Sequence, residues 1–160
     1  MTSNKTVFFI IGILLIILGF FMLVPYGVQI FYKEDSHSFL SSSFITILIG
    51  TLFMLANLQD KYELNLKQTF LFSTFTWIAV ALFGSIPFIL SDLDFSLSDS
   101  FFESMSGITT TGSTVITNLD DSPKSILMWR AIMQWLGGVG IIVMAITVLP
   151  LLKVGGMQLF

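Results

Sequence analysis

The sequence predicts an all-α integral membrane protein with four transmembrane helices and one short re-entrant segment. Of its 160 residues, 54% are hydrophobic and 11% are charged, whereas soluble domains carry roughly 25% charged residues. A chain of this length cannot bury so much apolar surface away from water. The charged residues also fall between long charge-free runs. Lipid must therefore be the solvent for much of the chain.

Four charge-free runs predict the transmembrane helices. A helix that crosses a bilayer needs about 20 mostly apolar residues, and four runs reach this length: residues 6–32, 38–59, 68–91 and 131–152. They predict spans at residues 7–31, 39–57, 69–90 and 126–152, the last of which also contains Arg130. A cleaved signal peptide is the alternative interpretation of the first run. It is disfavoured because the apolar stretch 7–24 is too long and residues 24–26 offer no small-residue cleavage site.

A fifth charge-free run, residues 104–119, differs from the other four. Eight of its 16 residues carry hydroxyl groups, so it is too short and too polar to cross a bilayer. Non-helical backbone at membrane depth is tolerated only where protein or a water-filled cavity surrounds it. We therefore expect a re-entrant segment here, preceded by a short helix over residues 98–108 that Ser98 or Asp99 caps.

The residues Thr110, Thr111, Gly112 and Ser113 follow that short helix and suit the binding of a dehydrated cation. Backbone carbonyls replace the lost water when successive residues turn them toward one axis. Glycine reaches the dihedral angles that this needs most cheaply, and threonine hydroxyls add further acceptors. A threonine-rich loop with one glycine is by itself more often only a loop. Its position between two strong spans favours an ion selectivity filter.

Other classes of function find no support in the composition. The sequence contains no cysteine and a single histidine, His37, which excludes disulfides and argues against a zinc site. The net charge of −3 argues against a nucleic-acid partner. No predicted span contains Asp or Glu, and one histidine leaves no nucleophile–base pair. We therefore expect neither an enzyme nor a bound cofactor.

Several ordered motifs in the C-terminal half resemble those of a known family. They are ALFGSIPF at residues 81–88, FFESMSGITTTGST at 101–114, WR at 129–130, QWLGGVGII at 134–142, LPLL at 149–152 and GGMQLF at 155–160. In this order they resemble the membrane subunit of the Trk-type bacterial potassium uptake system, within the Trk/Ktr/HKT potassium transporter family. The two N-terminal spans match by topology only.

The resemblance implies a potassium-channel-like fold, in which helix–pore loop–helix repeats surround one pore after two extra N-terminal helices. Residues 1–66 would hold the extra helix pair and residues 67–160 the first repeat, with further repeats expected after it. Carbonyls of four residues would bind potassium as one quarter of the filter: Thr110, Thr111, Gly112 and Ser113. One repeat cannot close a ring of carbonyls. We therefore expect a fragment of a longer protein, or else several copies that assemble, and we also expect a homo-oligomer.

The same resemblance implies potassium uptake across the cell inner (plasma) membrane by a multi-pass protein. Potassium would move either passively or coupled to another ion, in which case sodium or a proton would be the coupling ion of a symport. A cytoplasmic nucleotide-binding regulatory subunit, TrkA-like, would dock near residues 61–67 and beyond Lys153. The expected partners are thus potassium, this subunit and the lipid bilayer, without nucleic acid. The alternative is a small tetraspan accessory or assembly subunit that does not conduct, for which Gly112 would be dispensable.

Arg130, near the outer end of the last span, could pair with Glu103, Asp120 or Asp121. We favour a structural ion pair or a snorkelling anchor over a charge that tunes ion occupancy beside the loop.

Three glycines of the last span also have two interpretations. Gly137, Gly138 and Gly140 could let this helix pack closely against a neighbour, or they could let it bend. Close packing is favoured.

Overall fold

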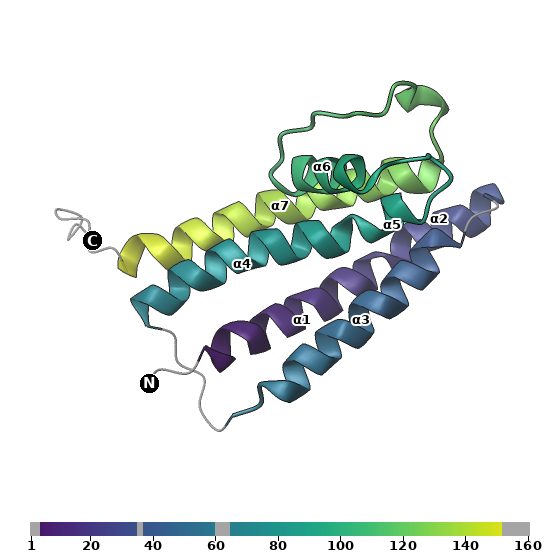
Figure 1. Ribbon diagram of the computed structural model, residues 1–160. Helices are drawn as coiled ribbons and strands as arrows, with labels where there is room; N and C mark the ends of the chain where they lie inside the picture. The colour runs from purple at the N-terminus through teal and green to yellow at the C-terminus, as the bar shows by residue number, and fades with distance from the viewer. Residues whose placement is uncertain (1–3, 35–36, 60–64, 152–160) are drawn as a thin grey trace.

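The computed structural model describes residues 4–34, 37–59 and 65–151, and the regular structure within them is helical throughout (Figure 1). Four stretches are long and apolar enough to cross a membrane: Lys5–Tyr32, Ser38–Ala56, Lys67–Ile89 and Lys124–Ile146. They coincide with the four predicted spans, so the prediction of an all-α protein with four candidate membrane spans is confirmed. Residue 152 and the motif at 155–160 lie outside the described residues.

The four spans contain six of the helices. The first span consists of α1 (Lys5–Phe21) and α2 (Leu23–Tyr32), the second of α3 (Ser38–Ala56), the third of α4 (Leu66–Gly84) and α5 (Ile86–Ile89), and the fourth of α7 (Lys124–Leu151). Between the third and fourth spans lie α6 (Leu97–Ile108) and the 3₁₀ turn η1 (Leu119–Asp121). Successive spans alternate in direction, and α6 lies against the N-terminal half of α7 (Figure 1).

Two of the spans are interrupted next to a proline. α1 ends at Phe21 and α2 begins at Leu23, because Pro25 has no N–H for the carbonyl four residues earlier. α4 ends at Gly84 and α5 begins at Ile86, with Pro87 in its first turn. The charge-free runs around both prolines predict one span each, and charge alone does not reveal these breaks.

The N-terminal spans touch through two glycines. A Cβ atom added to Gly12 would lie 2.7 Å from the carbonyl oxygen of Gly50, and one added to Gly50 would lie 2.8 Å from that of Gly12. The backbones of α1 and α3 are therefore in direct contact. Small residues permit this packing, which is a common way of joining helices in lipid.

The start of α6 corrects one detail of the sequence analysis. The helix begins at Leu97, and its N-cap is Ser96 rather than Ser98 or Asp99. The Ser96 hydroxyl accepts a hydrogen bond from the Asp99 N–H at 3.2 Å, and the Asp99 carboxylate accepts one from the Ser96 N–H at 3.2 Å. This reciprocal capping box places Asp99 at the third helical position, where its charge also favours the helix N-terminus.

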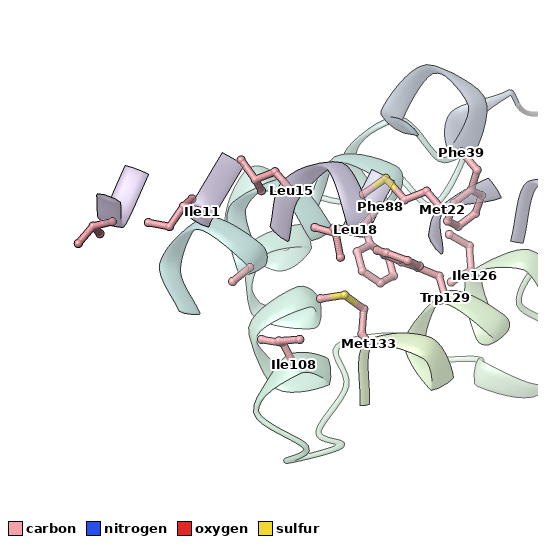
Figure 2. Packing of buried hydrophobic residues seen from close by; sticks show 12 residues of the cluster. Ile11, Leu15, Leu18, Met22, Phe39, Phe88, Ile108, Ile126, Trp129 and Met133 are labelled. Atoms are coloured by element: carbon pink, nitrogen blue, oxygen red, sulfur yellow. The ribbon is translucent and has the colours of Figure 1, made fainter. Parts of the chain in front are cut away.

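A buried cluster joins the spans at the end of the bundle that carries α5 and the start of α7. Its members come from the α1–α2 junction, α3, α5 and α7: Met22, Phe39, Phe88, Ile126 and Trp129 (Figure 2). The Trp129 ring meets that of Phe39 edge to face, with centroids 6.0 Å apart. Its indole N–H donates to the Gly84 carbonyl at 3.0 Å. The interruption of the third span is thus stabilised by a side chain from the fourth.

A polar contact also fixes the first span to the start of α7. The Glu34 carboxylate, just after α2, accepts hydrogen bonds from the Ser125 hydroxyl and from the Ser125 N–H, the latter at 3.2 Å. The first N–H groups of a helix have no partner within it. Glu34 satisfies one of them with a negative charge that the helix N-terminus favours.

Candidate ion-binding loop

The position of the loop is set by the point at which α6 ends. Gly137 of α7 lies directly against the carbonyl of Ile108, the last residue of α6, since a Cβ added to Gly137 would lie 1.8 Å from that oxygen. Gly137 follows Lys124 by 13 residues, about 20 Å at 1.5 Å per residue. The chain therefore reaches the middle of α7 at Ile108 and returns over residues 109–123 to the start of the same helix.

The last turn of α6 closes with a Schellman motif. The Thr111 N–H donates to the Ser106 carbonyl at 3.0 Å, and the Thr110 N–H donates to the Gly107 carbonyl at 2.9 Å. The motif requires a left-handed residue, usually glycine, after the helix. Here that residue is Thr110, with φ of 58°. A β-branched residue in this conformation stores backbone strain of about 1–2 kcal/mol.

Ser106 organises the loop that follows. Its carbonyl accepts from the N–H groups of Thr111 and Gly112, the second at 3.3 Å. Its hydroxyl donates to the Ser113 carbonyl at 2.6 Å. One residue of α6 thus fixes three successive loop residues. The sequence analysis did not single it out, because a seven-residue separation across an irregular loop has no periodic signature.

Gly112 adopts a backbone conformation that suits glycine. Its φ is +78°, and a Cβ atom there would lie 3.3 Å from the side-chain nitrogen of Gln134 in α7. Both the dihedral angle and the neighbouring amide oppose a larger residue. Gln134 is a second residue that the sequence analysis quoted only as part of a motif.

The four predicted site residues form one exposed stretch: Thr110, Thr111, Gly112 and Ser113. The Ser113 carbonyl is engaged by Ser106. Within the described part of the chain, the carbonyls of the other three residues accept no hydrogen bond. Carbonyl oxygens that lack a protein partner remain available to water or to a cation.

Arg130 pairs with Glu103, which is one of the three partners considered from the sequence. Asp121 instead accepts from the Asn118 side-chain amide at 2.7 Å. Glu103 is buried, with 1% of its surface exposed. Its carboxylate also accepts from the Thr114 hydroxyl at 2.5 Å and from the Val115 N–H at 2.6 Å. The buried ion pair is therefore hydrogen-bonded to the loop at Thr114 and Val115.

The glycines of α7 divide between the two interpretations. Gly137 makes the close contact with Ile108 that tight packing predicts, whereas added Cβ atoms at Gly138 and Gly140 would meet no atom within 4 Å. Close packing is thus confirmed for Gly137, and the described residues give no packing reason for the other two.

Two features of residues 4–34, 37–59 and 65–151 argue against other ion sites there. No group of three or more His, Cys, Asp or Glu side chains there could hold a metal ion. A cavity of about 490 Å³ lies between α1, α4 and α7, next to Ile108 and Gly137. Its walls are mostly apolar, so it offers few of the oxygen atoms that a dehydrated cation requires.

These features define a class of protein, namely a helical membrane protein with a helix and loop inserted between its third and fourth candidate spans. The family model described as TrkH, cation transport protein, matches residues 35–160. The chain belongs to this family, which confirms the resemblance seen in the sequence. Because the family consists of cation transport proteins, the expectation that the chain is not an enzyme is also confirmed.

Individual relatives agree with this assignment. The Trk system potassium uptake protein TrkH of Vibrio parahaemolyticus is 39% identical over 158 residues, which cover 98% of this chain and 33% of that protein. The Trk system potassium uptake protein TrkI of Halomonas elongata is 41% identical over 152 residues, covering 94% and 31%. The crystal structure of the potassium transporter TrkH from Vibrio parahaemolyticus superposes with a TM-score of 0.90 at 38% identity, covering 98% of this chain and 34% of that one. The chain thus spans about a third of the length of these relatives.

Proposed function

We propose that this chain supplies one helix–pore loop–helix side of a potassium-selective pore in the cell inner membrane. In this proposal α6 is a re-entrant pore helix, and the carbonyls of Thr110, Thr111, Gly112 and Ser113 contribute to the selectivity filter. The observation that carries the proposal is the contact between Ile108 and Gly137, since it ends α6 at the middle of a membrane-spanning helix. Relatives named as potassium uptake proteins support potassium as the ion.

The chemistry of such a site is coordination without covalent change. A potassium ion that enters a narrow path loses water, and inward-facing carbonyl oxygens replace it. The unpartnered carbonyls of Thr110, Thr111 and Gly112 fit this role. The C-terminal end of α6, which carries partial negative charge, lies next to them and favours a cation there.

The proposal divides the chain into an N-terminal helix pair, residues 1–66, and one pore repeat, residues 67–160. The direct contact of α1 with α3 supports the pairing of the first two spans. The contacts of α6 with α4 and α7 support the grouping of these three helices into one repeat. One loop cannot surround an ion. The other sides of the pore come from further polypeptide of the same protein or from further copies of this chain.

Coupling and regulation belong to the same proposal. Potassium would enter with sodium or a proton, and a TrkA-like nucleotide-binding subunit would bind the cytoplasmic face. Its predicted docking segments are residues 61–67 and those beyond Lys153. Residues 60–64 and 152–160 lie outside the described residues.

The test of the filter is Gly112→Ser in the complete natural protein, produced in bacteria that lack their own potassium uptake. The substitution adds a side chain at a left-handed position beside Gln134. We expect rubidium uptake to fall and the preference for potassium over sodium to decrease by about tenfold, as the loss of roughly 1.4 kcal/mol of differential binding would produce.

The matched control for this test is Gly27→Ser. Gly27 lies in α2, and an added Cβ there meets no atom within 4 Å. Uptake and selectivity should stay at wild-type levels in this variant. Normal uptake and selectivity in Gly112→Ser would instead support the accessory-subunit alternative.

A further inference from the structure

A hydrogen-bonded network joins the buried ion pair of Glu103 and Arg130 to residues 114–116, called here the outgoing limb of the loop. The Thr114 hydroxyl and the Val115 N–H both donate to one carboxylate oxygen of Glu103, at 2.5 and 2.6 Å. The Arg130 guanidinium donates to the other carboxylate oxygen. The outgoing limb is therefore bonded to α6 through the carboxylate.

Thr114 lies at the centre of this network. Its hydroxyl donates to Glu103 and accepts from the Arg130 guanidinium at 2.6 Å and from the Ile116 N–H at 3.0 Å. A hydroxyl has one donor and two acceptor positions, and all three are used. Thr114 itself is solvent-exposed, so this ordering comes from specific bonds and not from burial.

The charges of the network also compensate each other. The Glu103 side chain is fully buried and that of Arg130 is 12% exposed. A buried carboxylate is costly unless it is paired and hydrogen-bonded. An unpaired guanidinium beside the loop would repel an approaching cation. Arg130 thus stabilises the buried negative charge of Glu103, and Glu103 neutralises the positive charge of Arg130 beside the loop.

Two successive parts of the loop are held from the same helix. Ser106 bonds the incoming residues through Thr111, Gly112 and Ser113, and Glu103, one turn earlier on α6, bonds the outgoing limb. The unpartnered carbonyls belong to Thr110, Thr111 and Gly112, so two of them are on residues that Ser106 holds and all three come shortly before the residues that Glu103 holds. Selectivity among cations depends on the number and the position of such carbonyls, so an attachment that fixes the backbone also affects which ion fits.

We propose that Glu103 and Arg130 are positioning residues that clamp the outgoing limb through Thr114 and thereby set the cation selectivity of the loop. This inference rests on the proposed function, because it assigns a role to residues behind the same filter. Neither residue touches the ion. They act through the backbone of residues 114–115.

The primary test replaces Thr114 in the complete natural protein, produced in cells that lack their own potassium uptake. Thr114→Val keeps the shape and removes the hydroxyl, whereas Thr114→Ser restores it. Thr117→Val removes an exposed hydroxyl three residues further along and serves as the matched control. The readout is the potassium concentration, relative to the sodium concentration, that halves rubidium uptake, measured at equal amounts of protein in the membrane.

We expect Thr114→Val to lower the preference for potassium over sodium by about tenfold or more, the effect of losing hydrogen bonds to charged partners. Thr114→Ser and Thr117→Val should keep the wild-type ratio. A merely structural role would change the amount of protein and its melting temperature but leave this ratio unchanged. An unchanged ratio in Thr114→Val, with normal uptake by the wild type, would overturn the clamp alone. Absence of potassium and rubidium uptake by the wild type would overturn the proposed function and the clamp with it.

A second variant tests the compensation of charge. Glu103→Gln leaves the Arg130 guanidinium without its carboxylate, so we expect a lower maximal rate of uptake for potassium and sodium alike. Asp94→Asn removes an exposed carboxylate ahead of α6, at a left-handed position that asparagine tolerates, and should leave the rate within twofold of wild type. Equal rates in both variants would contradict the role of Glu103. Since a buried substitution can prevent folding, the Thr114 variants decide the proposal if Glu103→Gln is not produced.

Discussion

The carbonyl of Ile108 occupies the space that a side chain at Gly137 would need, with 1.8 Å between that oxygen and an added Cβ atom. This contact joins the end of α6 to the middle of α7. It depends on a backbone atom, which cannot move aside as a flexible side chain can. The depth of the loop in the bundle therefore depends on one glycine.

Gly137→Ala should displace α6 and lower the free energy of unfolding of the detergent-purified protein by at least about 1–3 kcal/mol, the usual cost of overpacking. Gly138→Ala is the control, because it adds the same methyl group to the same helix where no atom lies within 4 Å. It should be neutral or stabilising, since alanine favours a helix more than glycine does. Equal effects of the two changes in an unfolding titration would refute the contact.

Ser106→Ala should weaken the loop, because the Ser106 hydroxyl is bonded to the Ser113 carbonyl at 2.6 Å. The expected loss of unfolding free energy is about 1 kcal/mol, accompanied by faster hydrogen exchange of residues 111–113. Ser104→Ala is the matched change on the same helix. The Ser104 hydroxyl is buried without a hydrogen-bond partner in the described structure, so its removal should cost nothing or stabilise. A larger loss for Ser104→Ala would contradict the prediction.

Thr110→Gly should relieve the strain of a β-branched residue at φ of 58°. The gain is about 1–2 kcal/mol of left-handed strain, less the entropy that glycine adds to the unfolded chain, about 0.5–1 kcal/mol. A small rise in melting temperature is therefore expected. Thr109→Gly places glycine at φ of −82° and removes a hydroxyl that bonds to the Met105 carbonyl. This control should lower the melting temperature, and the opposite order would be inconsistent with a strained Thr110.

Trp129→Phe should destabilise the junction of the third span. It leaves the Gly84 carbonyl without the indole N–H that bonds to it at 3.0 Å and opens space in the buried cluster. A loss of roughly 2–4 kcal/mol is expected from an unsatisfied buried carbonyl plus a cavity. Trp135→Phe is the control, since Trp135 is 60% exposed and should change the unfolding free energy by less than about 0.5 kcal/mol. Similar losses for both would argue against the hydrogen bond.

The proposed pore requires more than one loop. Native mass spectrometry of the particle extracted from its own membranes should therefore give a mass several times that of this 17.8 kDa chain. The denatured mass then separates one long polypeptide from several identical copies. A native particle of 17.8 kDa would favour the accessory-subunit alternative, because a single loop cannot surround an ion.

Much of the architecture could be predicted from the positions of the charges. Lipid excludes charged side chains, so the charge-free runs marked the first three spans to within a few residues and the fourth span from residue 131 onward, after Arg130. The short hydroxyl-rich run correctly indicated a separate element between the last two spans. The interruptions at Met22 and Ser85 were not predicted, because a proline in an apolar run leaves no change in polarity.

The sequence by itself determined the class of protein, the family motifs and the place of Gly112 in the chain. Only the tertiary structure decided which groups surround that glycine. Glu103 was one of three partners for Arg130 that the sequence allowed, and only the packing of α6 on α7 selects it. The same holds for Ser106 with Ser113 and for Ile108 with Gly137. Solvent preference is a property of each residue and can be read along the chain, whereas hydrogen bonds and close approaches are properties of pairs that folding brings together.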